Sequence, residues 1–217
     1  MQESERNLKK QRIRNFFSSF EIASRESDEE SVESRVANVG LAYKQMRLPV
    51  NQITPDFENE LQKKVEHNIL KAKVREATGE DLENVMHIHN RSWMVSNTPF
   101  RPISIDSLEI IHEYPETIIL IAKVYGEDAG FVILDFEGPN KEIGVIAGLG
   151  VLPRFQRKGL GTVLGMAAWR KFKEKGVKEL KCEVYKENNV SYEFIKSLGF
   201  EVYETKVYKM EDFTPKD

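Results

Sequence analysis

The chain has 217 residues, of which 40% are hydrophobic, and a formal net charge of −3. Such a length allows one domain with an extension, or two small domains, and the apolar content is enough for a packed core. Domains that bind nucleic acid usually carry a basic excess, so the net charge argues against nucleic acid as the main partner.

The single cysteine, Cys182, excludes an internal disulfide and fits a reducing compartment. It falls on a strand pattern, so we expect a buried inert thiol and not a nucleophile. No apolar run approaches the roughly 18 residues needed to cross a membrane, and the first residues, Met-Gln-Glu-Ser-Glu-Arg, do not resemble a secretory signal. We therefore expect a cytoplasmic protein without a membrane span.

Residues 1–70 are highly charged and nearly free of glycine, and we predict a helical or partly disordered extension. The acidic, serine-rich residues 24–34 read as a linker or a frayed helix. Pro49 ends one predicted helix, and Thr54 and Pro55 are the expected cap and first residue of the next. The apolar positions with helical spacing are Ile13, Phe16, Phe17 and Phe20, then Val32, Val36, Val39, Tyr43 and Met46, then Phe57, Leu61, Val65 and Ile69.

The first of these stripes lies among basic residues, which is typical of a helix that binds a membrane surface or a partner. The alternative is a helix that packs on its own domain or on a second subunit, as in a homodimer, and we favour this alternative. No residue type in the extension has catalytic spacing. We therefore expect the extension to be separable from the chemistry of the rest.

Residues 71–217 alternate between strand and helix patterns, which predicts an α/β domain. A hairpin turn is expected at residues 126–128, where Gly-Glu-Asp separates two apolar runs. The expected strands are residues 72–77, 117–125, 129–136, 142–151, 180–185 and 202–210, and the expected helices are 81–92, 105–112, one opened by Gly159 and a short one before Gly199.

The stretch from Gly148 to Gly176 carries the clearest chemistry. An apolar strand ends near Val151, and Gly159 and Gly161 open an amphipathic helix. The first N–H groups of a helix have no internal partner, and the helix dipole adds positive charge there. Basic side chains at the rim are Arg154, Arg157 and Lys158. The pattern predicts a cradle for a diphosphate; the alternative is an ordinary turn whose glycines permit tight packing.

The run Gln156-Arg157-Lys158-Gly159-Leu160-Gly161 resembles the Gln/Arg-x-x-Gly-x-Gly/Ala signature of the GNAT superfamily of N-acetyltransferases. The strand at residues 180–185, Asn188 and the later Leu198-Gly199-Phe200 resemble the family's next strand and its Asn…Gly-Phe helix. The similarity covers roughly residues 71–211. The run is not a Walker phosphate loop, since no Gly-Lys-Ser/Thr follows, and it lacks the Gly-x-Gly-x-x-Gly of a dinucleotide fold.

This resemblance implies a mixed, mostly antiparallel sheet flanked by helices over residues 71–217. It also implies acetyl transfer from acetyl-CoA to a primary amine, on a small molecule or a protein, by direct attack in a ternary complex. No cluster has metal-ligand spacing, so no metal is expected. The residues expected to hold the acyl donor are Leu149, Gly150, Val151, Gln156, Arg157, Lys158, Gly159, Leu160, Gly161, Thr162 and Asn188, and a backbone N–H near Leu149 to Val151 is the implied oxyanion donor.

The catalytic groups are less clear from the sequence. A base must deprotonate the ammonium, and an acid can help the thiolate leave. Glu142 and His89 are candidate bases, and Tyr192 is a candidate acid because Ile195 occupies the position where many family members carry a tyrosine. Other titratable candidates are His87, His112 and Asp135. Each of these side chains could instead be structural or solvated.

The acceptor region is expected at residues 90–103, where Trp93, Phe100 and Arg101 could shape a pocket or form a hydrophobic plug. Two other classes of function remain open. One is an acyl-CoA-binding regulatory module that no longer catalyses, because no clear base is present. The other is a protein-interaction subunit whose working surface is the N-terminal segment.

Overall fold

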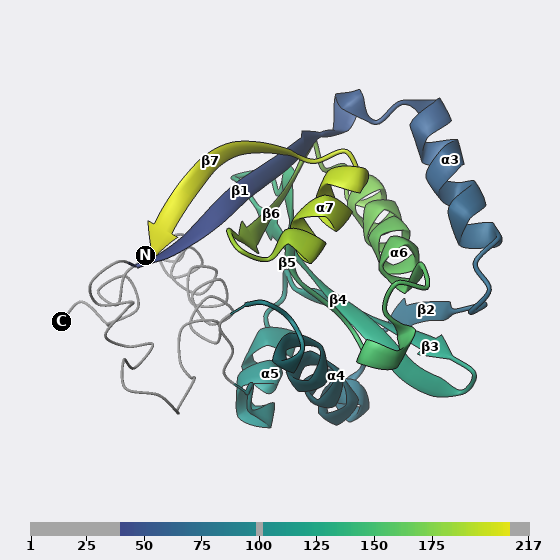
Figure 1. Ribbon diagram of the computed structural model, residues 1–217. Helices are drawn as coiled ribbons and strands as arrows, with labels where there is room; N and C mark the ends of the chain where they lie inside the picture. Colours follow the sequence, from purple (N-terminus) through teal and green to yellow (C-terminus); the bar gives the residue numbers. More distant parts are fainter. Residues whose placement is uncertain (1–39, 99–101, 209–217) are drawn as a thin grey trace.

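The computed structural model describes residues 40–98 and 102–208, in which seven strands form one mixed sheet in the order β2-β3-β4-β5-β6-β1-β7 (Figure 1). The strands are β1 (Leu41–Pro49), β2 (Lys73–Glu76), β3 (Ile118–Val124), β4 (Glu127–Glu137), β5 (Ile143–Val151), β6 (Glu179–Tyr185) and β7 (Glu201–Tyr208). Only β5 and β6 pair in parallel, and the other neighbours are antiparallel. The expected mixed, mostly antiparallel sheet flanked by helices is confirmed.

Helices cover both faces of this sheet. The helices are α3 (Pro55–Glu66), α4 (Leu82–Met94), α5 (Ile105–His112), α6 (Leu160–Glu174) and α7 (Asn189–Ser197), with short 3-10 turns at 50–52, 79–81 and 153–155. A Cβ atom added at Gly144 would meet Phe172 of α6, whereas one added at Gly150 would meet Ser92 of α4. Side chains alternate along a strand, and one bulge lies between these two glycines. Helices α6 and α4 therefore lie on opposite faces.

The predicted elements after residue 70 are confirmed within a few residues. The helix expected at 105–112 is α5, with the same bounds. The β3–β4 turn begins earlier than expected: Tyr125 and Gly126 both have positive φ, 52° and 87°. Two such residues are typical of the tight hairpin turn that matches the twist of antiparallel strands. The residues after Gly126 consequently already belong to β4.

The second helix predicted in the N-terminal segment is wrong over residues 41–49, which form strand β1. This strand lies inside the sheet, between β6 and β7, and is paired on both sides. A bulge at Gln45/Met46 breaks its alternation, so Tyr43 and Met46, three residues apart, are both buried. A bulge shifts the buried side of a strand by one residue, so a half-buried strand with a bulge can imitate helical spacing.

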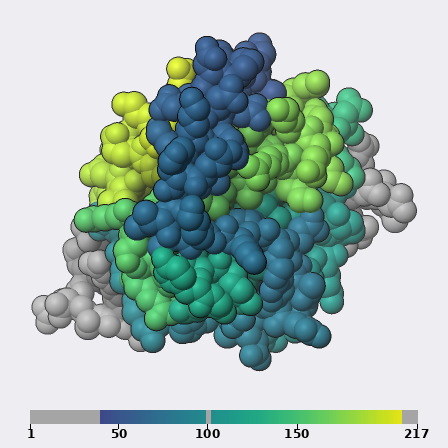
Figure 2. Space-filling view, turned by 90° about the vertical axis from the view of Figure 1, so that its right-hand side faces the viewer, coloured from purple at the N-terminus to yellow at the C-terminus, as the bar shows by residue number. Residues whose placement is uncertain are grey.

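The third predicted helix is confirmed as α3. The Thr54 side chain accepts a hydrogen bond from the Phe57 N–H (3.2 Å), and Pro55 is the first helical residue. The helix ends earlier than the apolar stripe indicated, and Ile69 is 73% exposed beyond it. Figure 2 shows α3 as a blue column running down the middle of one face of the molecule.

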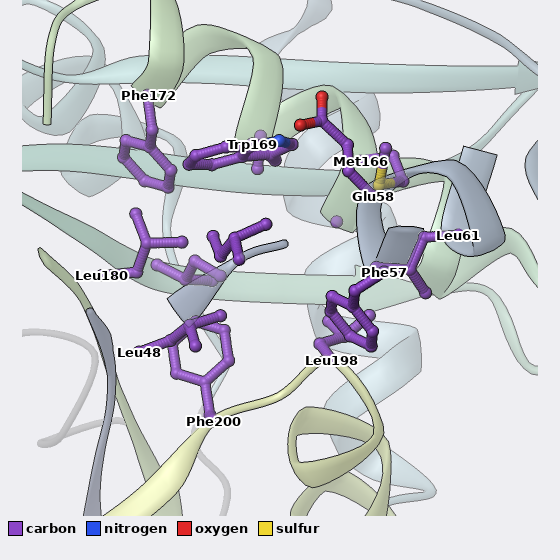
Figure 3. Close-up of a pocket in the computed structure, with 14 residues that line it drawn as sticks. Leu48, Phe57, Glu58, Leu61, Met166, Trp169, Phe172, Leu180, Leu198 and Phe200 are labelled. Carbon is purple, nitrogen blue, oxygen red and sulfur yellow. The ribbon is translucent and has the colours of Figure 1, made fainter. Parts of the chain in front are cut away.

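Helix α3 packs against the C-terminal half of α6. Arg170 donates to Gln62 Oε1 (2.6 Å), and the Lys173 ammonium lies 3.1 Å from Glu58. A small cavity of about 40 Å³ lies between the two helices and the sheet (Figure 3). Its lining is apolar apart from Glu58 and includes Leu61 of α3 and Trp169 of α6. The segment that was expected to be separable thus packs on the same helix that the glycine turn opens.

The stripe at Ile13 to Phe20 and the acidic stretch at residues 24–34 lie outside the described residues. The division at residue 70 stays a prediction, and the position of β1 inside the sheet shows that residues 41–49 lie on the same folded unit as the strands after it. Among the described residues, none of the helices combines the length and apolarity required to cross a bilayer.

Candidate functional site

The parallel strands β5 and β6 separate part of the way along β5, so that the two form a fork. Their last paired residues are Ile146 and Cys182. At the same level a bulge inserts Ala147 into β5, because Ile133 pairs with Gly148 while Leu134 pairs with Ile146. Beyond the bulge, among the described strands, β5 pairs only with β4 as far as Val151. The β6-facing backbone groups of this half of β5 therefore have no strand partner.

The turn that follows β5 directs the chain into α6. A single 3-10 turn at 153–155 reverses the direction, and Gln156 donates its side-chain amide to the Val151 carbonyl (2.9 Å). Arg157 and Gly159 adopt the left-handed region with φ of 57° and 81°. The Gln156 side chain thus ties the turn to the last residue of β5.

The first turn of α6 has no side-chain cap and no acidic residue. Its leading N–H groups cannot have partners inside the helix, and the exposed side chains of Arg157 and Lys158 add positive charge beside them. Arg154, the third basic residue expected at the rim, forms an ion pair with Glu127 of the neighbouring hairpin. This start of α6 offers uncapped donors and a positive field to an anion.

Two glycines of α6 serve close packing against α7, which is the alternative considered from the sequence. A Cβ at Gly161 would lie 3.0 Å from Cζ of Phe194, and one at Gly165 would lie 3.2 Å from Cδ1 of Leu198. The two helices therefore approach each other over positions without side chains. Gly161 is explained by this contact, whereas Gly159 is required by its positive φ.

Asn188, which was expected to contact the acyl donor, is the N-cap of α7. Its Oδ1 accepts from the Ser191 N–H (3.0 Å), and its Nδ2 donates to Thr98 Oγ1 (2.7 Å). Nearby, Asn97 donates to the Glu187 carbonyl (3.1 Å). These bonds connect the segment after α4 to the loop before α7. The Asn188 side chain thus already has a protein partner on both of its polar atoms.

His89 is buried and neutral. It is 1% exposed, and its ring stacks on Trp93 at 4.3 Å. Asn90 Oδ1 also accepts from the Ile103 N–H, so the His89 Nδ1 is the donor in the 3.1 Å bond to Asn90. Burial lowers the pKa of His89 to about 4. A buried imidazole with this pKa is poorly suited to take a proton from an ammonium at neutral pH.

Within the predicted acceptor region, Trp93 packs into the core against His89 and Phe131. This contact favours the hydrophobic plug over the pocket for that side chain. Phe100 and Arg101 lie outside the described residues.

Glu142 is not brought to the turn. It precedes the nine-residue strand β5, at the end opposite Val151, which places it about 30 Å away along the strand. Its carboxylate accepts from the Asn140 N–H (2.9 Å) and closes the β4–β5 connection. Of the other candidates, His87 is exposed on α4, and buried Asp135 accepts from the Phe136 N–H (2.8 Å).

Tyr192 lies on α7, and Cys182 is the last residue of β6 that pairs with β5. Tyr192 is in the first turn of α7, and the Lys44 ammonium lies 3.5 Å from the centroid of its ring. Ile195, at the position of the usual tyrosine, is buried in the core. Cys182 is a buried thiol on β6, as expected, and burial raises its pKa. A thiol in this state does not act as a nucleophile.

Within residues 40–98 and 102–208, no group of three or more His, Cys, Asp or Glu side chains is placed to hold a metal ion. One contact that shapes the site has no signal in the local sequence: Asn68, which lies after α3, bonds the turn at Lys158 across 90 residues.

The sequence model of the acetyltransferase (GNAT) family matches residues 82–200, more than half of the chain. The chain belongs to the GNAT acetyltransferase family, whose members are acetyl-CoA-dependent acyltransferases. Among curated proteins, no sequence matches the chain significantly.

Solved structures with the same fold include several acetyltransferases. The aminoglycoside acetyltransferase AAC(6')-Iy, in complex with a bisubstrate analogue, has 22% identity and a TM-score of 0.53 over 63% of this chain and 95% of its own. Ard1 from Thermoplasma volcanium has 24% identity and a TM-score of 0.54 over 61% and 84%. The aminoglycoside acetyltransferase meta-AAC0020 from an uncultured soil metagenomic sample, in complex with sisomicin, has 18% identity and a TM-score of 0.55 over 67% and 97%. At these identities the likeness shows the fold alone.

Proposed function

We propose that the protein transfers an acetyl group from acetyl-CoA to a primary amine, by direct attack in a ternary complex. The observation that carries this proposal is the fork between β5 and β6, which opens toward the uncapped start of α6. An acyl-CoA has a diphosphate and an extended arm with two amides, and the two parts of this site have complementary chemistry.

The diphosphate is assigned to the turn at Gln156 to Thr162. There the leading N–H groups of α6 and the cations of Arg157 and Lys158 favour an anion. The amides of the arm are assigned to the β6-facing edge of β5, at Leu149 to Val151, where an extended chain can bond to the backbone as an added strand does. The Asn188 side chain contributes mainly by fixing the start of α7, next to the mouth of the fork.

For the chemical step, the backbone of β5 beyond the bulge is the proposed oxyanion donor. Donors aimed at the developing charge, together with positioning of the two reactants, lower the barrier for attack on a thioester carbonyl. Direct attack is favoured because Cys182 is buried with a raised pKa and so is unsuited to carry the acyl group. The leaving thiol, with an ordinary pKa of about 8.5, can depart with protonation by water or by Tyr192.

The acceptor is proposed to be an amine, on a small molecule or on a protein. The names of two solved structures with the same fold indicate both kinds of acceptor. One is an aminoglycoside acetyltransferase, and the other is a ribosomal-protein-S18-alanine N-acetyltransferase. Ammonium must lose its proton before attack, and neither His89, which is buried, nor Glu142, which is remote, is placed to take it directly. A water molecule at the mouth of the fork is the proposed first proton acceptor.

Two measurements on the whole chain test the proposal. Calorimetry with CoA should give one site per chain, and thiol release from acetyl-CoA should depend on an added amine from a panel of aminoglycosides, polyamines and amino-terminal peptides. Binding of CoA without turnover on any amine would favour the non-catalytic regulatory module, which the burial of His89 and the remoteness of Glu142 would then explain. Absence of CoA binding would reject both functions.

A further inference from the structure

Asn68 connects the N-terminal part of the fold to the glycine turn. It follows α3, is 8% exposed and lies 90 residues before its partner Lys158. Its Nδ2 donates to the Lys158 carbonyl (2.8 Å), and its Oδ1 accepts from the Leu70 N–H (2.8 Å). Its backbone carbonyl accepts from the Lys71 N–H (3.3 Å). The side chain is therefore held in one orientation, with its donor aimed at the turn.

The bond from Asn68 fixes the peptide unit between Lys158 and Gly159. In a trans peptide the carbonyl and the following N–H point in opposite directions. Because Asn68 holds the Lys158 carbonyl, the Gly159 N–H is directed away from Asn68. The N–H groups that follow it, at the start of α6, also have no partners inside the helix.

The same contact explains why residue 159 is glycine. Its φ of 81° lies in the region that L-residues rarely adopt. A Cβ at this position would also lie 2.5 Å from Asn68 Nδ2, which is closer than atoms can approach. A side chain at residue 159 would therefore have to displace the Asn68 amide from the turn.

Asn68 is held in place by α3, which is itself fixed on α6. Gln62 and Glu58 of α3 bond Arg170 and Lys173 of α6, and apolar side chains of both helices surround the cavity in Figure 3. Helix α6 is thus attached to α3 over its C-terminal half and to Asn68 at the turn that opens it. A site fixed in this way before its ligand binds loses little conformational entropy on binding.

We propose that Asn68 is a positioning residue for the diphosphate of acetyl-CoA. It does not touch the ligand but aims the Gly159 N–H at the diphosphate by holding the Lys158 carbonyl. This inference rests on the proposed function. It gives α3, which precedes Asn68, a part in ligand binding. It also predicts that the diphosphate depends on the turn, whereas the pantetheine arm does not.

The test compares Asn68→Asp with the whole wild-type chain. Aspartate keeps the size and the oxygen that accepts from Leu70 but places a second oxygen against the Lys158 carbonyl. We expect affinity for CoA, measured by calorimetry, to fall by about tenfold or more, while affinity for pantetheine, which lacks the diphosphate, changes by less than about twofold. Asn68→Ala, which adds no charge, should show the same selective loss and replaces the first variant if that one does not fold.

Gln62→Glu is the matched control, because it makes the same amide-to-carboxylate change on α3 and keeps an oxygen for Arg170. It should leave CoA affinity within about twofold of wild type. An independent measurement uses the wild type alone: the Gly159 amide proton resonance should shift on addition of CoA or inorganic diphosphate and should not shift with pantetheine.

Two outcomes would overturn the positioning role. One is CoA affinity within about threefold of wild type in both folded Asn68 variants. The other is an equal loss of CoA and pantetheine affinity, which would indicate general damage to the fold. A wild-type chain that binds no CoA would instead reject the proposed function, so the two failures are distinguishable.

Discussion

Helices α6 and α7 follow the parallel strands β5 and β6 and begin beyond the carboxyl ends of these strands (Figure 1). Their first turns differ. The start of α7 is capped within the protein, because the Asn188 side chain accepts from the Ser191 N–H. The start of α6 has Gly159 in place of a capping side chain and no acidic residue in its first turn. Both helices need partners for their leading N–H groups.

The difference supports the proposal that the diphosphate binds at the start of α6 and not at the start of α7. An N-cap side chain satisfies donors and stabilises a helix by about 1 kcal/mol. Helix α6 lacks that contribution and is held instead by Asn68 at the turn and by α3 over its C-terminal half. Neither contact uses the leading N–H groups of α6, so these donors stay open to an anion. A capping side chain would occupy them.

The largest expected effect comes from removing the support of α6. A chain that starts at Lys71 lacks β1, which pairs with both β6 and β7, and lacks α3 with Asn68. We now expect this chain to show no cooperative unfolding transition in thermal circular dichroism and no CoA binding. A chain that starts at Gly40 keeps all seven strands and serves as the control. If the shorter chain folds and binds CoA, the segment is separable after all.

Replacing Gly159 by alanine changes the backbone and the packing at the uncapped start of α6. The positive φ alone costs an L-residue about 1–2 kcal/mol, and the new Cβ would press on Asn68 Nδ2. We expect CoA affinity to fall by about tenfold or more, measured by calorimetry on the folded variant. Gly161→Ala is a useful comparison, because its Cβ meets Phe194 and tests packing with α7. Equal effects of the two variants would argue against the special role of Gly159.

Replacing Asn188 by alanine removes the cap that distinguishes α7. We expect the free energy of unfolding to fall by about 1 kcal/mol, measured by denaturant titration, because the Ser191 N–H loses its partner. CoA affinity should change by less than about threefold. Asn188→Asp, which keeps an oxygen for Ser191, should recover most of the stability. A tenfold loss of CoA affinity at wild-type stability would show direct contact with the ligand.

Tyr192→Phe tests whether a hydroxyl in the first turn of α7 takes part in the chemical step. The ring packs against the core and lies under the Lys44 ammonium, so we expect kcat to change by less than about threefold. Loss of a general acid typically lowers the rate by about a hundredfold or more. A decrease of that size in steady-state kinetics, with unchanged CoA affinity, would assign the hydroxyl to the leaving thiolate and exclude water.

Cys182→Ala is expected to have the smallest effect on catalysis. Cys182 is the last β6 residue paired with β5 and is buried, with a raised thiol pKa. The variant should keep kcat within about twofold while losing roughly 1 kcal/mol of stability from the vacated volume. Steady-state patterns should stay those of a ternary complex. An acetylated Cys182 detected by mass spectrometry in the wild type would contradict direct transfer.

Features that depend on neighbouring residues were predictable from the sequence. The cap at Thr54 with Pro55, the bounds of α5 and the glycine turn before α6 follow from local rules, and the structure has them. The family was recognisable for the same reason, because its signature is a contiguous run. Each of these signals acts over a few residues, where hydrogen-bonding and backbone preferences are the same in any fold.

The catalytic candidates depended on contacts that spacing does not reveal. His89 on α4 looked suitable for an acceptor site, but the helix turns it into the core, where burial lowers its pKa to about 4. Glu142 lies on the approach to the correct strand but at its far end. Sequence position placed His89 on α4 and Glu142 next to β5. Only the packing decided that the His89 side chain lies in the core and that Glu142 lies far from the turn.

The sequence by itself determined the helices after residue 50, the alternation of strands and the glycine turn before α6, because each is encoded by a short run of residues. The tertiary structure decided that residues 41–49 form a strand, where β5 and β6 separate, and that Asn68 reaches Lys158 across 90 residues. These features arise from pairing and packing between distant segments. Apolar periodicity within a short window shows that a residue is buried, but it does not show which residues cover it. Strand β1 and the bond from Asn68 to the turn therefore follow from the tertiary structure and not from the local sequence.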